Sequence, residues 1–175
     1  MNSVKKLDAL AIFETAALPH VADLYRCAMA LLGDPSEAEA AVEESLQKAW
    51  QSADRFRPGA NCRPGLYRIL FQVVSRRRQA LPRPSHTARL VVSKDDLLGV
   101  LRRMPEQVAQ VVLLADVHEF TYQEIQETLG ISESMLALRL RSGRDELAGA
   151  APDDHSGRPV WSRESEENRR LEAAQ

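Results

Sequence analysis

The chain has 175 residues and a mass of 19.5 kDa, enough for one ordinary domain or two small ones. Its 44% apolar but only 5% aromatic residues leave the core to leucine, alanine and valine, a composition typical of packed helices. The two cysteines are far apart, and no stretch of the sequence has the pattern of a signal peptide or a membrane span. We therefore expect a reduced, cytoplasmic protein with no disulfide framework, zinc site or membrane insertion.

Helical patterns fill the first part of the chain. Residues 8–32 predict a helix interrupted by a proline, and Asp34 followed by Pro35 predicts the capped start of a second helix. A loop rich in proline and glycine spans 55–65. It precedes a third predicted helix that ends in three arginines, where the helix dipole favours positive charge.

A linker is predicted over residues 80–93, which contain two prolines and little periodicity. A short helix at 94–103 and another beginning near Pro105 follow it. The linker has no apolar face that could dock it, so we expect the domains on either side to move independently. The four histidines have no ligand spacing and are expected at the surface or in turns.

Residues 120–147 have the signals of two short helices joined by a tight turn. Thr121 and Glu124 form a capping box, Gly130 occupies the position that ends a helix, and Ser132 caps the last helix. This arrangement predicts a helix-turn-helix.

The predicted fold is therefore all-α. It consists of a first helical domain at 8–79, the linker at 80–93, a helix-turn-helix domain at 94–150, and a charged, poorly ordered tail at 151–175.

Charge is arranged in blocks along the chain. Residues 34–50 contain five acids and one lysine, residues 51–89 contain nine arginines and one acid, and residues 99–150 contain five arginines and eight acids. Each block can face a partner of opposite sign.

Three stretches resemble the two domains of bacterial RNA polymerase sigma factors of the extracytoplasmic-function (ECF) type. They are LYRCAMALLGDPSEAEAAVEESLQKAW, RFRPGANCRPGLYRILFQVVSRRR and MPEQVAQVVLLADVHEFTYQEIQETLGIS, in family order over about residues 20–150. The resemblance implies a protein that is not an enzyme and needs no cofactor, metal or small-molecule substrate. Its expected partners are core RNA polymerase, promoter DNA and an anti-sigma factor.

The resemblance also assigns candidate residues by position. A coiled coil on the polymerase β′ subunit would bind the acidic second helix, through Glu39, Glu43, Glu44 and Lys48. The arginine-rich third helix would bind the −10 element through Arg63, Arg68, Gln72, Arg76, Arg77 and Arg78. The helix-turn-helix would bind the −35 element through Thr121, Ser132, Glu133, Ser134, Arg139, Arg141 and Arg144.

The sequence departs from the family pattern in both DNA-reading segments. Gln72 and Arg76 stand where the family usually has Asn and Asp, and Ala137 stands where a lysine is common. Gly143 lies in the interior of the last helix, where glycine costs about 1 kcal/mol relative to alanine. The preferred hypothesis is a promoter-directing sigma factor. Two alternatives remain open: a sigma-like decoy that binds an anti-sigma factor or polymerase without reading promoters, and an ordinary helix-turn-helix repressor.

Overall fold

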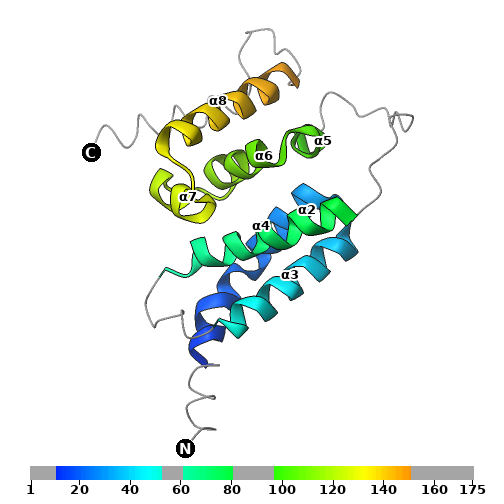
Figure 1. Ribbon diagram of the computed structural model, residues 1–175. Coiled ribbons are helices and arrows are strands. Elements are labelled where there is room, and N and C mark those ends of the chain that lie inside the picture. Colours follow the sequence, from blue (N-terminus) through cyan, green and yellow to red (C-terminus); the bar gives the residue numbers. More distant parts are fainter. Residues whose placement is uncertain (1–10, 53–60, 81–96, 151–175) are drawn as a thin grey trace, which may run out of the picture.

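The computed structural model describes residues 11–52, 61–80 and 97–150, which form an all-α fold without strands in these ranges (Figure 1). A helical segment at 11–17 is followed by η1 (Leu18–His20), α2 (Val21–Leu32), α3 (Pro35–Gln51), α4 (Arg63–Ala80), α5 (Leu97–Arg103), α6 (Glu106–Val112), the π-helical turn η3 (Leu113–Val117), α7 (Tyr122–Leu129) and α8 (Glu133–Ala150). None of these helices is long and apolar enough to cross a membrane. Most of the predicted linker and the whole predicted tail lie outside the described residues.

The helices α2, α3 and α4 pack side by side as the first domain (Figure 1). The turn between α2 and α3 has the predicted chemistry: Gly33 ends α2 in the left-handed conformation with φ 76°, and the Asp34 carboxylate accepts a 2.9 Å hydrogen bond from the Glu37 amide. Leu24 and Leu70 are fully buried in this bundle. Trp50 is partly buried and packs edge to face with Phe13.

The helices α5 to α8 form the second domain, in which α7 and α8 are the predicted helix-turn-helix. Thr121 and Glu124 make both bonds of the capping box, and Gly130 ends α7 with φ 65°. The Ser132 hydroxyl accepts a hydrogen bond from the Met135 amide at the start of α8. On α8, Leu136 and Leu140 are buried in the core, while Met135 is 40% exposed.

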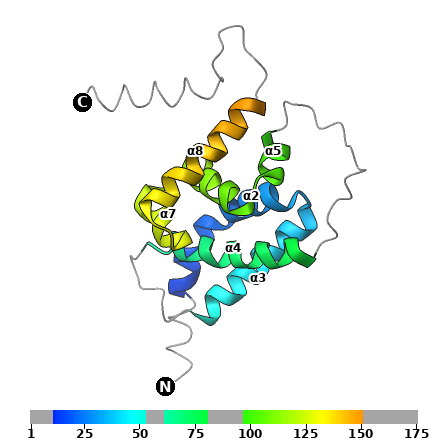
Figure 2. The same ribbon diagram turned by 45° about the horizontal axis from the view of Figure 1, so that its top comes forward.

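The two domains pack directly against each other, contrary to the expectation that they move independently. α7 lies on α4 and α5 lies on α2, and two views of the molecule agree on this arrangement (Figures 1 and 2). Buried residues of both domains form one continuous core. The helix surfaces themselves make this contact, so an apolar face on the linker is not needed for docking.

Gly143 is the point at which α8 crosses α6 most closely. A Cβ at this position would lie 2.3 Å from Val112 Cγ2 and 3.0 Å from Val108 Cγ1, and both valines are buried. The glycine is therefore required by packing, and the helix-propensity cost expected from the sequence is outweighed by the close approach it permits.

Replacing Gly143 with alanine should lower the free energy of unfolding by about 1–3 kcal/mol, because a stiff, buried valine has to move. Gly149→Ala on the same helix is the matched control, since its Cβ would meet nothing within 4 Å and should be neutral or slightly stabilising. Urea denaturation of both variants measures the difference. Equal stabilities would contradict the proposed crossing.

Candidate nucleic-acid and partner interfaces

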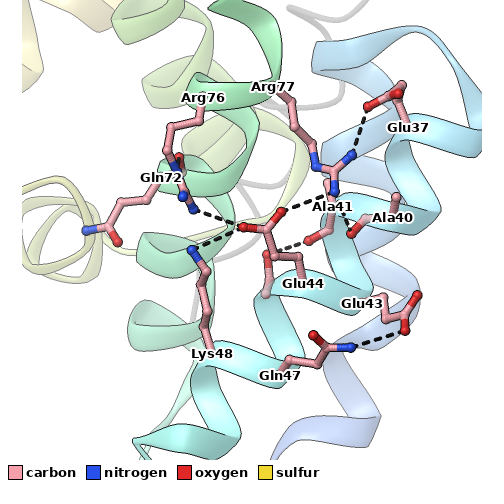
Figure 3. A network of polar contacts seen from close by, with 11 residues as sticks. Glu37, Ala40, Ala41, Glu43, Glu44, Gln47, Lys48, Gln72, Arg76 and Arg77 are labelled. Atoms are coloured by element: carbon pink, nitrogen blue, oxygen red, sulfur yellow. Dashed lines mark hydrogen bonds and ion pairs between the residues drawn. The ribbon is translucent and has the colours of Figure 1, made fainter. Parts of the chain in front are cut away.

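An exposed polar stripe runs along the outer side of α3. Glu39, Glu43 and Gln47 are spaced four residues apart, so they lie on one face of the helix, and all three are exposed. Gln47 donates a 3.1 Å hydrogen bond to Glu43 on the side of α3 away from Arg76 and Arg77 (Figure 3). We call these three residues the acidic stripe.

Glu44 lies beside the acidic stripe but is turned toward α4 (Figure 3). Its carboxylate accepts from Lys48 at 3.1 Å, from Arg76 at 3.0 Å and from Arg77 at 3.1 Å. Arg77 also donates to Glu37 at 2.9 Å. Lys48, followed by Arg77 and Arg76, lowers the pKa of Glu44, so this carboxylate stays charged.

These contacts connect two candidate sets that the sequence placed on separate surfaces. Glu44 and Lys48 belong to the predicted polymerase face, and Arg76 and Arg77 belong to the predicted −10 face. In the structure they form one network, which we call the α3–α4 brace. Arg77 and Glu44 are each about one-quarter to one-third exposed, so screening by water is reduced and the brace holds the two helices in register.

The other predicted arginines of α4 donate to backbone carbonyls of the second domain. Arg63 donates to the His118 carbonyl and lies 4.0 Å from the Phe120 ring centroid. Arg68 donates to the carbonyls of Glu127 and Thr128, which are near the C-terminal end of α7.

Two further arginines, one from each domain, donate hydrogen bonds to backbone carbonyls of the other domain. Arg78 of α4 donates 3.1 Å to the Arg102 carbonyl at the C-terminal end of α5. Arg102 in turn donates 3.4 Å to the Ala30 carbonyl at the C-terminal end of α2, and its side chain lies against Gly33. Carbonyls at helix ends lack intrahelical partners and carry partial negative charge, so each arginine satisfies an acceptor and opposes that charge. We call the contacts of Arg63, Arg68, Arg78 and Arg102 the arginine caps.

Tyr67 lies at the centre of the contact between the domains. Its ring is fully buried and packs edge-on against Phe120 and His118, with centroid distances of 4.9 and 5.2 Å. Its hydroxyl shares a 3.0 Å hydrogen bond with His118 Nδ1. Gln72, also predicted to bind DNA, is exposed farther along α4.

His118 lies in a bend, within the expectation that the histidines are at the surface or in turns, but its side chain is only 5% exposed. It follows η3 and precedes Glu119, which has a positive φ of 52°, so the chain reverses direction there and directs the ring inward. Burial, and then the nearby Arg63 guanidinium, lowers the pKa of His118 to about 4 against the opposing effect of Asp23. The ring is therefore neutral at physiological pH.

The start of α8 presents its predicted polar residues to solvent. Ser132, Glu133 and Ser134 are all exposed, and Ser132 and Ser134 share a 3.0 Å hydrogen bond. Thr121, predicted to bind DNA, caps α7 with its hydroxyl.

The arginines of α8 differ in their exposure and in whether other side chains already bind them. Arg139 donates to Gln107 at 2.8 Å, and Arg144 makes a two-pronged ion pair with Asp116 at 2.5 and 3.1 Å. Arg141 is 85% exposed and lies 3.9 Å from Asp145. Beside it Leu138 is 63% exposed, so the outward face of α8 is nearly neutral and partly apolar.

Tyr67, His118 and Arg102 were missed as site residues. Tyr67 and His118 are 51 residues apart, and Arg102 and Ala30 are 72 apart. A single sequence carries no signal that pairs residues at such separations. The local signal that was present, a pair of arginines just before Pro105, indicates only the end of a helix.

A first domain of three packed helices and a second domain with a capped helix-turn-helix define a class of DNA-associated, all-α proteins. Residues 94–147 match the family described as Sigma-70, region 4, and residues 17–71 match the Sigma2 domain of PhyR. The chain is 29% identical to the ECF RNA polymerase sigma factor SigE of Mycolicibacterium smegmatis, with 73% of this chain and 57% of that protein covered. It is 24% identical to the ECF RNA polymerase sigma factor EcfG of Rhodopseudomonas palustris, with 75% and 80% covered.

Two solved structures share the fold. The sigma factor RpoE in complex with the anti-sigma factor NepR, from Bartonella quintana, superposes with a TM-score of 0.63 at 20% identity, covering 79% of this chain and 95% of that one. The anti-anti-sigma factor PhyR complexed with NepR, from the same organism, gives 0.57 at 18%, covering 78% and 49%. Both matched segments are sigma-factor domains, and the chain is similar in sequence to ECF sigma factors; it spans a little over half the length of the SigE relative.

Lowering the pH should destabilise the folded chain through His118. In the unfolded chain the histidine pKa is about 6.5, whereas the folded value is about 4, so the unfolded state binds the proton more readily. The stabilisation is complete well above pH 6.5 and is lost as the pH falls toward 4; the part lost between pH 7.5 and pH 5 is on the order of 2 kcal/mol. Urea unfolding at pH 7.5 and pH 5 measures it. His118→Gln removes the titrating ring and should flatten the dependence; an unchanged dependence would contradict this assignment.

Proposed function

We propose that this protein binds core RNA polymerase and directs it to promoters as a sigma factor. The observation that carries the proposal is the presence, in one chain and in family order, of a Sigma2-type helical bundle and a region 4 helix-turn-helix with its caps intact. The two matched segments are the counterparts of the sigma domains for which we propose contacts with the −10 and −35 elements. In this proposal the protein positions core RNA polymerase at the promoter, and the polymerase catalyses RNA synthesis.

The acidic stripe is the proposed polymerase-binding surface. Its carboxylates point to solvent and have the charge needed to steer a basic coiled coil onto α3. Glu44 and Lys48 act differently in this proposal: they belong to the α3–α4 brace and hold α3 in place for binding.

Promoter contacts are proposed for the arginines of α4 and for the start of α8. Phosphate binding requires accessible cations, which Arg63 and Arg68 become when the second domain moves off α4. Ser132 and Ser134 stand at the start of the second helix of the helix-turn-helix, the position from which such helices contact base edges.

An anti-sigma factor is the proposed regulatory partner. The RpoE and PhyR structures from Bartonella quintana were both determined with NepR, which is named as an anti-sigma factor. The similarity supports a partner of that class for this chain and leaves its identity open.

A sigma-like decoy is the second candidate function. It is favoured by the nearly neutral, partly apolar outward face of α8, where Leu138 is exposed and only Arg141 extends fully into solvent, and by the match of the first domain to PhyR. Run-off transcription with core polymerase and the natural promoters upstream of genes that depend on this protein separates the two. Promoter-dependent transcripts support the sigma factor; polymerase or anti-sigma binding without any transcript supports the decoy.

Reversing the charge of Glu39 and Glu43 together should weaken binding to core polymerase at least tenfold while leaving the unfolding midpoint within a few degrees, because both carboxylates are exposed. Glu44→Gln is the contrasting variant, which removes the charge held by the α3–α4 brace and should lower stability more than Glu39→Lys/Glu43→Lys does. Fluorescence anisotropy with labelled core and thermal unfolding measure the two effects. Unchanged polymerase affinity in the double reversal would rule out the acidic stripe.

Replacing Arg63 and Arg68 with alanine should flatten the salt dependence of promoter binding by holoenzyme by about 1.4 units, at about 0.7 for each phosphate contact to a single strand. Replacing Arg139, Arg141 and Arg144 should flatten it less, because two of the three already have partners, and should mainly reduce discrimination between promoters. Titrations at several salt concentrations measure both slopes. If neither set changes the slope, this chain does not bind DNA as proposed.

A further inference from the structure

We propose that Leu138 is a specificity-determining residue of α8, which selects a thymine in the promoter by contact with its C5-methyl group. This inference rests on the proposed function and names the base chemistry that the helix-turn-helix recognises. It concerns a feature that the charge pattern does not explain, an exposed leucine on the outward side of the helix.

The outward side of α8 lies opposite the residues that the helix buries. α8 packs on α5, α6 and α7 at the outer side of the second domain (Figures 1 and 2). Leu136 and Leu140 are buried on the inner side of the helix. Ser134, Leu138 and Arg141 follow the helical repeat on the opposite side, and all three are exposed. We call these three residues the outward ridge.

Leu138 stands at a position where a helix-turn-helix meets the bases. The second helix of such a motif enters the major groove with its first turns against the base edges. Leu138 lies within the first two turns of α8, and its side chain is 63% exposed. An isolated surface leucine needs no explanation, but this one lies between Ser134 and Arg141 on the side available to the groove. DNA binding in this orientation buries the leucine against a base pair.

Thymine is the base that offers an apolar side chain a favourable partner in the major groove. The edges of adenine, guanine and cytosine present hydrogen-bond donors and acceptors there, whereas thymine also presents a methyl group. A leucine placed against one of the other bases excludes water from a polar group without replacing its hydrogen bond. Contact with the methyl group instead removes apolar surface from water on both partners. Leu138 therefore favours thymine and disfavours the other bases.

The other exposed groups of α8 do not supply this selection. The Ser134 hydroxyl can donate or accept a hydrogen bond, so it fits several base edges and discriminates weakly. Arg141, which is 85% exposed and 3.9 Å from Asp145, can bind a phosphate or a guanine but has no complement to a methyl group. The remaining arginines of α8 already have side-chain partners. Selection of thymine thus depends on Leu138.

The test uses holoenzyme assembled from the full chain and core polymerase, with duplexes selected from a library randomised over one helical turn at the −35 position. The preferred thymine is then replaced by deoxyuridine, which removes only the C5-methyl group. Leu138→Ala shortens an exposed side chain and introduces a good helix former, so the fold is retained. Leu18→Ala is the matched control, because Leu18 is 62% exposed and lies in η1 of the first domain. Fluorescence anisotropy measures each dissociation constant.

Wild-type holoenzyme should select a thymine at one fixed position and bind the deoxyuridine duplex about threefold to fivefold more weakly, as expected for one buried methyl group. Leu138→Ala should bind both duplexes equally, while Leu18→Ala should match the wild type. A methyl preference that survives in Leu138→Ala, or is absent from the wild type, overturns the inference and leaves the proposed function intact. Unchanged base discrimination with weaker binding to core polymerase assigns Leu138 to a protein interface and also overturns it. If wild-type holoenzyme prefers no duplex at all, the proposed function itself fails, and the inference fails with it.

Discussion

The burial of Tyr67 between the two domains is the constraint on which the arrangement of the molecule depends. Its ring belongs to the first domain through Phe71 and to the second through Phe120, and it is excluded from solvent by both. α4 therefore packs against α2 and α3 in its own domain and against α7 in the other. The polar groups of α4 are set by this double packing, because each of its arginines faces either the acids of α3 or the helix ends of the second domain.

The packing of α4 gives arginines of the basic block at residues 51–89 a structural role that the charge pattern alone does not predict. A cluster of nine arginines suggests a surface open to nucleic acid, but in the folded chain Arg76 and Arg77 stabilise α3 while Arg63 and Arg68 hold the second domain. In this proposal the arginine side chains first hold elements of the protein together and later contact DNA. The acidic stripe on α3 is exposed while the two domains are packed together.

The sequence predicted the elements that depend on local chemistry. The caps at Asp34, Thr121 and Ser132 and the helix end at Gly130 act within four residues, so their signals are complete in a short window. The all-α class and the order of the family segments followed from periodicity and resemblance. The candidate residues on the acidic stripe and on α4 remain predictions, although the structure now divides them into exposed residues and residues with internal partners.

Contacts between distant segments could not be predicted from one sequence. From the sequence, Gly143 is a residue that weakens a helix, because Val112, whose close approach requires a glycine, is 31 positions away. The burial of His118 was not predicted because nothing nearby in the chain identifies Tyr67 as its partner. Packing of the two domains was missed for the same reason: the arginines that join them are balanced by backbone carbonyls, which leave no trace in a pattern of charged residues.

The most direct test of the account is the distance between the domains in free and bound protein. Cysteines introduced at Ser36 on α3 and Ser142 on α8, both exposed positions, can carry spin labels in a Cys62→Ser background. Pulsed electron–electron double resonance then measures the distance between the two labels. The account predicts one narrow distribution for the free chain and a longer, separate one after core polymerase is added. A broad distribution in the free chain would contradict the packing of the two domains, and the same narrow one in both samples would contradict their proposed separation on polymerase.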